Sequence, residues 1–320
     1  MQFKKPQFWD YKKISIWTII LIPLSIIYQF IYWLIKIFKP FKKFPIPVIC
    51  IGNIYLGGTG KTPLAREVFN ITKSLNKNPA FIKKSYTYLN DEIKMLEKNG
   101  KIFTSKYRAN SIYLSINNNH DVAILDDGFQ DFSIKPDLSI LCFNSKQLIG
   151  NGFVIPSGPL RENFSSIKRA DCIFINGNKN LEFENKIKSV NSNVRIFYSK
   201  YKIKNIEKLK NKKVVAFAGI GNPQNFFDLL NENNIDVKKT FSFPDHHKYS
   251  ERDYSYLVAQ RFMFTNIKTK KVNEHDVLLL TTEKDYSRIN EKMKKSFDYI
   301  EIELEIKDKD EFISLIKEKL

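Results

Sequence analysis

The chain has 320 residues, enough to bury a sizeable core and to form two domains. Its formal net charge of +18 predicts acidic partners, such as nucleic acid, anionic lipid or a phosphorylated substrate. Lysine supplies most of this charge, because the sequence contains only eight arginines. The three cysteines each lie in an apolar, strand-like run far from one another, which excludes a zinc knuckle of neighbouring cysteines and gives no reason to expect an oxidising compartment.

The first element in chain order is an apolar segment from Ile14 to Ile35, which contains no charged residue and has lysines on both flanks. As a helix it would be about 33 Å long, enough to cross the hydrocarbon core of a bilayer. A mild polar stripe recurs along it at helical spacing, which equally fits a helix lying in the membrane interface. The stripe consists of Thr18, Ser25, Gln29 and Tyr32. We therefore expect residues 1–39 to form a membrane-associated helix, either spanning or interfacial.

A phosphate-binding loop is predicted between residues 48 and 63, where a short apolar strand, a glycine-rich loop and a helical pattern follow one another. Glycines let backbone N–H groups crowd around phosphate oxygens, and the helix N-terminus adds a positive dipole end. We expect Lys61 to reach the β- and γ-phosphates of ATP and the Thr62 hydroxyl to ligate Mg²⁺. The usual glycine five residues before Gly60 is replaced by Tyr55. The expected nucleotide-binding residues are Gly57, Gly58, Thr59, Gly60, Lys61 and Thr62.

The second strong pattern is an apolar strand over residues 122–125 that ends in Asp126 and Asp127. Ligands of open α/β sheets bind at the carboxyl edge of the strands, and in a phosphate-loop protein an aspartate there holds Mg²⁺ directly or through water. The alternative is an Asp-Gly turn with solvated acids. Further along, a glycine- and proline-rich loop leads to Arg161 and Glu162, which form either part of a functional loop or a surface ion pair.

A second α/β pattern follows a lysine-rich stretch near residue 204. The sequence thus predicts a phosphate-loop, parallel-sheet domain over residues 40–203 and a smaller α/β domain over residues 204–320. Phosphoryl transfer to an alcohol also needs a group that takes the hydroxyl proton. Asp91 and the Asp245-His246-His247 cluster are the candidates, because histidine titrates near neutral pH.

Six motifs in order resemble those of the tetraacyldisaccharide 4′-kinases, the lipid A 4′-kinases of Gram-negative bacteria. The motifs are Gly52–Pro63, Asp126–Gln130, Pro156–Glu162, Ala218–Pro223, Phe243–His246 and Thr282–Asp285. The resemblance covers nearly the whole chain. It implies an ATP- and Mg²⁺-dependent kinase on the cytoplasmic face of the bacterial inner membrane. Such an enzyme phosphorylates the 4′-hydroxyl of a tetraacyldisaccharide 1-phosphate in lipid A biosynthesis.

The resemblance also implies roles for single residues. The catalytic set is Asp91, acting as base with His246, together with Lys61 and Asp127. The metal ligands are Thr62, Asp126, Asp127 and Glu162. The substrate side has Arg108 and Arg161. The chain departs from the family pattern before Asp91, where Lys83-Lys-Ser-Tyr-Thr replaces the usual Ser-Arg-Gly-Tyr-Gly and the following segment is shortened.

The expected partners are the lipid disaccharide and the inner-membrane surface; no nucleic acid is expected, and protein partners are left open. Two other functions fit parts of the pattern. A membrane-tethered ATPase coupled to a partner protein would use the same loop without a lipid acceptor. A non-enzymatic module that binds nucleic acid or lipid would explain the net charge without the loop.

Overall fold

The computed structural model describes residues 5–11, 13–85, 90–264 and 277–320, and the side chains of residues 90 and 91 lie outside this description. The chain divides into two compact units. Of the described residues, 5–11, 13–85, 96–200 and 304–320 form the large unit, and 90–95, 201–264 and 277–303 form the small unit. The domain limits expected from the sequence differ from this division at residues 90–95 and 201–203, which group with the small unit, and at residues 304–320, which group with the large unit.

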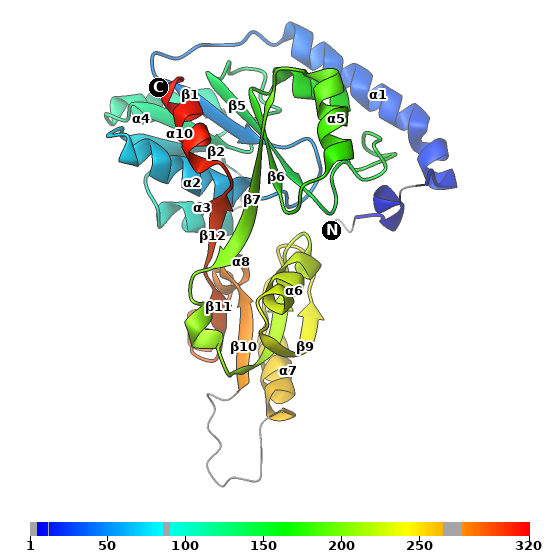
Figure 1. The fold of residues 1–320 in the computed structure, drawn as a ribbon, viewed down its shortest axis with the longest axis vertical. Helices are drawn as coiled ribbons and strands as arrows, with labels where there is room; N and C mark the ends of the chain where they lie inside the picture. The colour runs from blue at the N-terminus through cyan, green and yellow to red at the C-terminus, as the bar shows by residue number, and fades with distance from the viewer. Residues whose placement is uncertain (1–4, 12, 86–89, 265–276) are drawn as a thin grey trace. The chain divides into compact units, whose positions relative to one another are not determined.

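The described chain forms an eight-stranded sheet in the order β12-β7-β6-β5-β1-β4-β2-β3 (Figure 1). The strands are β1 (Val48–Gly52), β2 (Pro79–Lys84), β3 (Ile102–Ser105), β4 (Val122–Asp126), β5 (Leu138–Asn144), β6 (Cys172–Asn176), β7 (Arg195–Ile203) and β12 (Ile302–Ile306). β1 pairs in parallel with both β4 and β5, and these three strands are buried along their whole length. Their near-continuous apolar sequences suit a sheet that is covered on both faces. Because the strands are parallel, the carboxyl ends of β1 and β4 lie side by side.

The large unit also contains several helices and 3-10 turns. They are η1 (Gln7–Asp10), α1 (Ile16–Phe38), α2 (Lys61–Ser74), α4 (Arg108–Asn117), η2 (Phe164–Arg169), α5 (Leu181–Val190) and α10 (Lys309–Lys317). α2 buries one apolar face, with Leu64, Val68 and Ile71 among its covered residues. That spacing is the helical period read in the sequence. α2 therefore begins at the end of the glycine loop and packs against the sheet.

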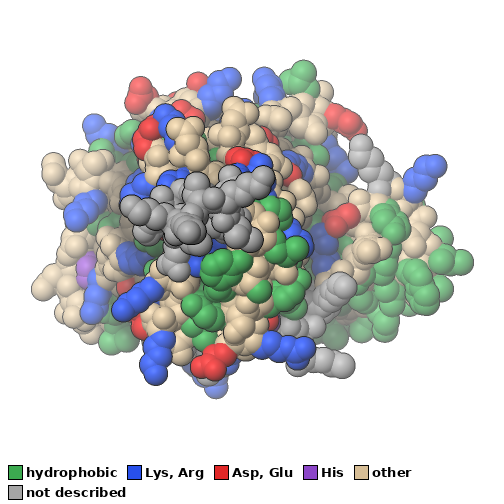
Figure 2. Space-filling model, turned by 90° about the horizontal axis from the view of Figure 1, so that it is seen from below, with side chains coloured by type: hydrophobic (Ala, Val, Ile, Leu, Met, Phe, Trp, Pro, Cys, Tyr) green, Lys and Arg blue, Asp and Glu red, His purple; other side chains and the backbone are tan. Residues whose placement is uncertain are grey.

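α1 is long and apolar enough to cross a membrane by length and composition. Its polar stripe faces the protein: Thr18 and Ser25 are buried, whereas most of its large apolar side chains are exposed. The exposed residues are Ile16, Trp17, Ile19, Ile20, Leu24, Ile26, Ile27, Phe30, Ile31, Trp33, Ile35, Ile37 and Phe38. Figure 2 shows hydrophobic side chains gathered at its right edge, on the side where α1 lies in Figure 1. The helix thus presents a continuous apolar face outward.

The small unit has a parallel four-stranded sheet in the order β11-β10-β8-β9. Its strands are β8 (Lys213–Ala218), β9 (Asp236–Ser242), β10 (Val277–Thr282) and β11 (Asp298–Ile300). Its helices are α6 (Pro223–Glu232), α7 (Glu251–Phe262), α8 (Glu283–Tyr286) and α9 (Glu291–Lys294), the 3-10 turn η3 (Ile206–Leu209), and most of α3 (Asn90–Glu97). Alternate residues of β8 enter two separate clusters, Val214 and Ala216 in one, Val215 and Phe217 in the other. This alternation means that helices cover both faces of the sheet. The expected α/β class with parallel sheets and an N-terminal apolar helix is confirmed.

Candidate active site

The glycine loop between β1 and α2 has the shape of a phosphate cradle. Gly57 and Gly60 have φ angles of 144° and 91°, in the region that favours glycine, and Gly60 is the residue before the first turn of α2. The Asn53 side chain holds the loop from inside, since its amide donates to the Tyr55 carbonyl at 2.7 Å and to the Thr59 hydroxyl at 2.9 Å. The loop therefore ends with backbone N–H groups at a helix N-terminus, where anions bind.

Tyr55 replaces the expected glycine because it is a core residue. Its ring is fully buried, its hydroxyl donates to Asp10 at 2.8 Å, and the Lys5 ammonium donates to that hydroxyl at 2.8 Å. The backbone next to it pairs with the later loop, where the Leu56 N–H donates to the Pro159 carbonyl. The freedom of the loop comes from Gly57 and Gly60 instead.

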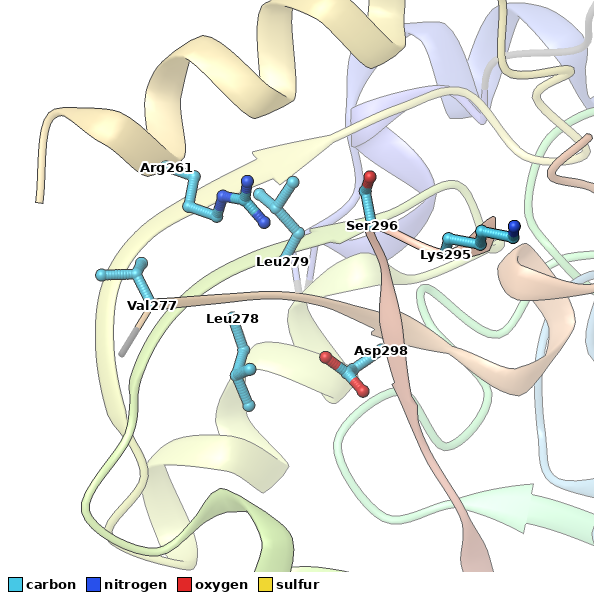
Figure 3. Close-up of a pocket in the computed structure, with 7 residues that line it drawn as sticks. All are labelled: Arg261, Val277, Leu278, Leu279, Lys295, Ser296 and Asp298. Atoms are coloured by element: carbon cyan, nitrogen blue, oxygen red, sulfur yellow. The ribbon is translucent and has the colours of Figure 1, made fainter. Parts of the chain in front are cut away.

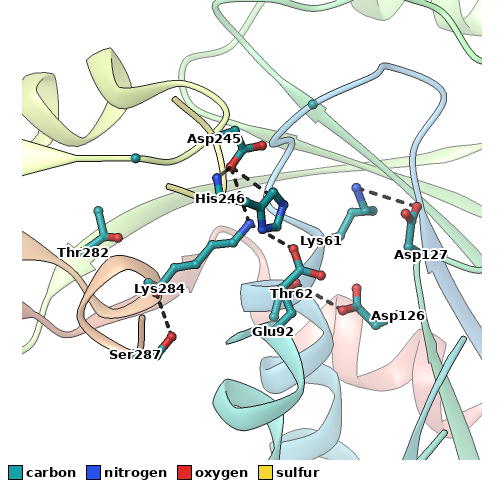
Figure 4. Close-up of polar contacts among 12 residues, drawn as sticks. Lys61, Thr62, Glu92, Asp126, Asp127, Asp245, His246, Thr282, Lys284 and Ser287 are labelled. Carbon is teal, nitrogen blue, oxygen red and sulfur yellow. Dashed lines mark hydrogen bonds and ion pairs between the residues drawn. The ribbon is translucent and has the colours of Figure 1, made fainter. Parts of the chain in front are cut away.

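Asp126 ends β4 beside the head of α2 (Figure 4). Its Oδ2 accepts from the Thr62 hydroxyl at 3.2 Å and from the Lys83 ammonium at 2.5 Å. Its Oδ1 is buried and has no hydrogen-bond partner among the described residues. A buried carboxylate oxygen without a partner is costly, and a divalent cation would satisfy it. Thr62 and Asp126 thus fit the hydroxyl-plus-aspartate pair that holds Mg²⁺ in phosphate-loop proteins.

Asp127 follows in the left-handed conformation, with φ of 62°. Its Oδ1 accepts from the Arg161 guanidinium at 2.8 Å and lies 3.7 Å from the Lys61 ammonium. Burial alone would raise the pKa of this carboxyl, but Lys61 and Arg161 hold it well below its usual range. Arg108 reaches the same place by donating to the Asp127 carbonyl at 2.7 Å. Four predicted site residues are thereby brought together in the large unit.

Glu162 lies near this cluster with both carboxylate oxygens engaged. Oε1 accepts from Gln130 at 3.1 Å, and Oε2 accepts from Arg169 at 2.5 Å. Among the described residues no group of three or more His, Cys, Asp or Glu side chains is arranged to hold a metal. A magnesium ion at the loop would accordingly have few protein ligands and would rely on phosphate oxygens and water, as Mg²⁺ usually does.

The loop that carries Arg161 is fixed by α1. The Ser25 hydroxyl donates to the Val154 carbonyl at 2.8 Å, and the Tyr28 hydroxyl donates to the Arg161 carbonyl at 3.1 Å. The Arg161 N–H in turn donates to the Ile54 carbonyl, next to the glycine loop. The apolar N-terminal helix and the phosphate cradle are therefore connected through one loop.

His246 belongs to the small unit, in the turn after β9, where its N–H donates to the Asp245 carboxylate at 3.0 Å. The Lys284 ammonium lies 4.0 Å from that carboxylate and 3.1 Å from Glu92 of α3 (Figure 4). The other candidate base, Asp91, precedes Glu92 in the same helix, and its side chain lies outside the described residues. The two candidate proton acceptors therefore belong to the same unit.

A small cavity in the same unit is lined by Arg261, Val277, Leu278, Leu279, Lys295, Ser296 and Asp298 (Figure 3). Its volume of about 90 Å³ is far below the several hundred Å³ of a ligand pocket. It lies where β10 begins, whereas the Thr282–Asp285 motif follows the end of that strand. Ligands of parallel sheets bind at the carboxyl end, so this cavity is not a candidate active site.

Sequence reasoning assigned no role to Asn53, Lys83, Gln130 or Arg288, which all contact predicted site residues or the loop that carries them. Arg288 carried a signal that went unused: it is one of only eight arginines and lies three residues after a recognised motif. Lys83 was noted only as part of the stretch that departs from the family pattern, and nothing in the sequence indicated a contact with Asp126. Only the fold places its ammonium on Asp126.

A glycine loop at the head of a helix, a strand-end aspartate beside its threonine and a parallel sheet define an α/β protein with a phosphate-binding loop. The family model described as tetraacyldisaccharide-1-P 4′-kinase (LpxK) matches residues 17–90 and 87–320. The chain belongs to this family, which confirms the resemblance seen in the motifs.

Single relatives agree with the family model. The tetraacyldisaccharide 4′-kinase of Pelagibacter ubique (strain HTCC1062) is 40% identical over 311 residues, covering 96% of this chain and 95% of that protein. The tetraacyldisaccharide 4′-kinase of Rickettsia typhi is 32% identical over 337 residues, covering 98% and 97%. The crystal structure of LpxK from Aquifex aeolicus in complex with ATP has a TM-score of 0.71 at 24% identity, covering 94% of this chain and 99% of that one. The fold is thus shared over 94% of this chain.

Proposed function

We propose that the protein transfers the γ-phosphoryl group of ATP to the 4′-hydroxyl of a tetraacyldisaccharide 1-phosphate, a step of lipid A biosynthesis. The single observation that carries this proposal is the cluster at the head of α2, where Lys61, Thr62, Asp126 and Asp127 come together beside the glycine loop. The relatives from Pelagibacter and Rickettsia bear the name of this activity and align over nearly their full length.

The residues of the large unit would have different roles according to their charge. Gly57 to Thr62 would cradle the phosphates, with Lys61 against the β/γ oxygens, because a fixed cation there stabilises charge that develops in the transition state. Arg161 and Arg108 would supply further positive charge toward a phosphorylated sugar. Asp127 keeps Lys61 and Arg161 in place before the nucleotide binds.

Thr62 and Asp126 would hold Mg²⁺, which bridges phosphate oxygens and neutralises their charge. The buried Asp126 Oδ1 that lacks a partner among the described residues supports this assignment. Asp127 and Glu162 remain predicted ligands, and each would have to exchange an arginine partner for the metal.

Residues 40–203 would bind the nucleotide, and residues 204–320 would bring His246 to the acceptor. Asp91 and His246 would act together on the proton of the sugar hydroxyl. Their membership of one unit supports this pairing, because α3 is connected to the His246 turn through Glu92, Lys284 and Asp245.

A lipid acceptor explains why α1 has an apolar and exposed face. One side of this helix is bound to the protein through Ser25 and Tyr28, and the opposite side is apolar and exposed. A helix with one face occupied in this way suits the plane of the membrane interface better than the bilayer centre. We propose that α1 attaches the protein to the cytoplasmic face of the inner membrane without crossing it.

Depth-dependent fluorescence quenching tests the position of α1. Ile26 is exposed in the middle of the helix, so the I26W variant in a W17F/W33F background places a tryptophan there. In vesicles with brominated lipids we expect quenching by shallow bromines. Strong quenching by bromines at the bilayer centre would show a spanning helix. Trp9, which is buried, provides an internal reference that the lipid does not reach.

Incubation with γ-labelled ATP and Mg²⁺, with and without the disaccharide 1-phosphate, tests the function. We expect label on the lipid from the wild type, and a loss of at least about 100-fold from Lys61→Ala, because the transition-state cation is removed. Lys73→Ala, at the exposed end of α2, is the matched control. Free phosphate without labelled lipid would instead identify an ATPase coupled to a partner. Absence of both products would identify a binding module.

A further inference from the structure

Three motifs of the small unit meet around one buried arginine. The Arg288 guanidinium donates through Nη1 to the Gly219 carbonyl at 2.7 Å and to the Asp285 carboxylate at 3.2 Å. Its Nη2 lies 3.2 Å from Nδ1 of His246. Gly219 comes from the Ala218–Pro223 motif, Asp285 from the Thr282–Asp285 motif, and His246 from the Phe243–His246 motif. Arg288 is thus the common partner of residues far apart in the chain.

We propose that Arg288 is a positioning residue that sets the orientation and the tautomer of the His246 ring. This inference deepens the proposed function, and its kinetic part rests on that function.

The argument begins with the direction of the hydrogen bond. A guanidinium has five N–H donors, no acceptor, and a charge that persists at every physiological pH. The ring nitrogen that faces it must therefore present a lone pair. In a neutral imidazole the other nitrogen then carries the proton, so His246 is held with Nδ1 bare and Nε2 protonated.

The surroundings of the ring agree with this assignment. The acidic oxygen Oδ1 of Asp245 lies 3.9 Å from Nε2, too far for a hydrogen bond but of the sign that favours an N–H there. The main chain of His246 is fixed as well, with φ of 58° and its N–H shared between the Gly219 carbonyl at 3.1 Å and the Asp245 carboxylate at 3.0 Å. The Gly219 carbonyl also accepts from Arg288. The main chain of His246 and its ring are therefore held by two groups that are bonded to each other.

Arg288 is itself held rigidly. Asp285 is fully buried and accepts from the Gly219 N–H at 3.0 Å, from the Tyr249 hydroxyl at 3.0 Å and from the Thr282 hydroxyl at 2.7 Å, in addition to Arg288. A buried carboxylate with this many donors has a fixed position, and a guanidinium bound to it shares that position.

The tautomer assigns roles to the two candidate bases. With Nδ1 against Arg288 and a proton on Nε2, the neutral ring has no free lone pair with which to take the sugar proton. It can donate from Nε2 to a carboxylate or to a substrate oxygen. The proton-accepting part then falls to a carboxylate, for which Asp91 is the candidate. Arg288 would act through His246 rather than on the reacting atoms.

Nitrogen-15 NMR of histidine-labelled protein reads the tautomer directly. The chain has four histidines, so His246→Gln assigns the signal by difference. We expect the Nε2–H pattern for wild-type His246, a mixture with the Nδ1–H form in Arg288→Met, and retention of the wild-type pattern in Arg288→Lys, because lysine also only donates. Arg252→Met, an exposed arginine of α7, is the matched control.

In the labelled-ATP assay, Arg288→Met should lower kcat about tenfold or more, with KM for ATP unchanged, and Arg288→Lys should restore part of the rate. An Nδ1–H pattern in the wild type, or an unchanged pattern in Arg288→Met, would overturn the inference. A redistributed tautomer with full kcat would overturn its link to catalysis. If Arg288→Met does not fold, the NMR spectra of Arg288→Lys and of the wild type still test the tautomer of His246. A wild type with the expected tautomer but no lipid product would refute the proposed function alone.

Discussion

Two aspartates paired with arginines show how differently the two units use the same groups. Asp127 of the large unit is about a third exposed, contacts Lys61 and Arg161, and has a pKa held below its usual range. Asp285 of the small unit is fully buried, and burial raises its pKa although Thr282 and Arg288 act in the opposite direction. The Asp127 carboxylate is accessible to a ligand, whereas the Asp285 carboxylate is enclosed by the protein.

The comparison indicates a division between binding and orienting. In the large unit, Oδ1 of Asp126 is buried and has no hydrogen-bond partner among the described residues. In the glycine loop before α2, nothing lies within 4 Å of a Cβ placed on Gly58. In the small unit the Asp285 carboxylate accepts four hydrogen bonds from Arg288 and its neighbours. A site that must accept phosphate and metal keeps polar groups unsatisfied, whereas a site that must fix one ring satisfies them.

Asp126→Asn should give the largest effect, because it removes the charge of the buried oxygen that would face Mg²⁺. We expect Mn²⁺ bound in the presence of ATP, measured by electron paramagnetic resonance, to bind at least about 10–100-fold more weakly. Thr72→Ser, a conservative change within α2, is the control. Unchanged Mn²⁺ affinity would place the metal on other residues.

Gly219→Ala tests the enclosed character of the small unit. A Cβ at this position would meet the Pro244 carbonyl at 3.0 Å, Asp285 Oδ1 at 3.1 Å and the His247 Cβ at 3.1 Å. We expect a loss of about 1–3 kcal/mol in the free energy of unfolding, measured by chemical denaturation.

Gly58→Ala is the matched change in the large unit, since nothing lies within 4 Å of its Cβ. Its effect on stability should stay within about 0.5 kcal/mol. Equal losses at the two glycines would remove the contrast between an open loop and a packed network.

The smallest expected effect is a change in the stability of the protein at acid pH. The folded-state pKa of Asp127 is lowered from the usual 3.8, so its ionised form stabilises the folded protein. This stabilisation is fully present above pH 3.8 and is lost as the pH falls through the folded-state pKa. The stability difference between wild type and Asp127→Asn should therefore be constant near neutral pH and shrink below about pH 4. A difference that grows in acid would contradict the cation pairing.

Several structural features of this protein can be predicted from local sequence. The glycine loop, the strand ending in Asp126 and the uncharged segment Ile14–Ile35, which forms most of α1, can be predicted because backbone torsion, apolar runs and helical period are properties of neighbouring residues in the chain. The polar stripe of α1 marked the face that packs on the protein, since Thr18 and Ser25 are buried there. The order of six motifs was enough to indicate the family.

The tertiary structure decided which groups meet. It places Lys83 on Asp126, Arg161 on Asp127 and Arg288 on His246, pairs separated by between 34 and 43 residues. It also groups residues 90–95, and with them the candidate base, with the small unit rather than with the large unit that contains β2. No local pattern specifies such pairs, because they depend on which strands lie side by side and where each strand ends.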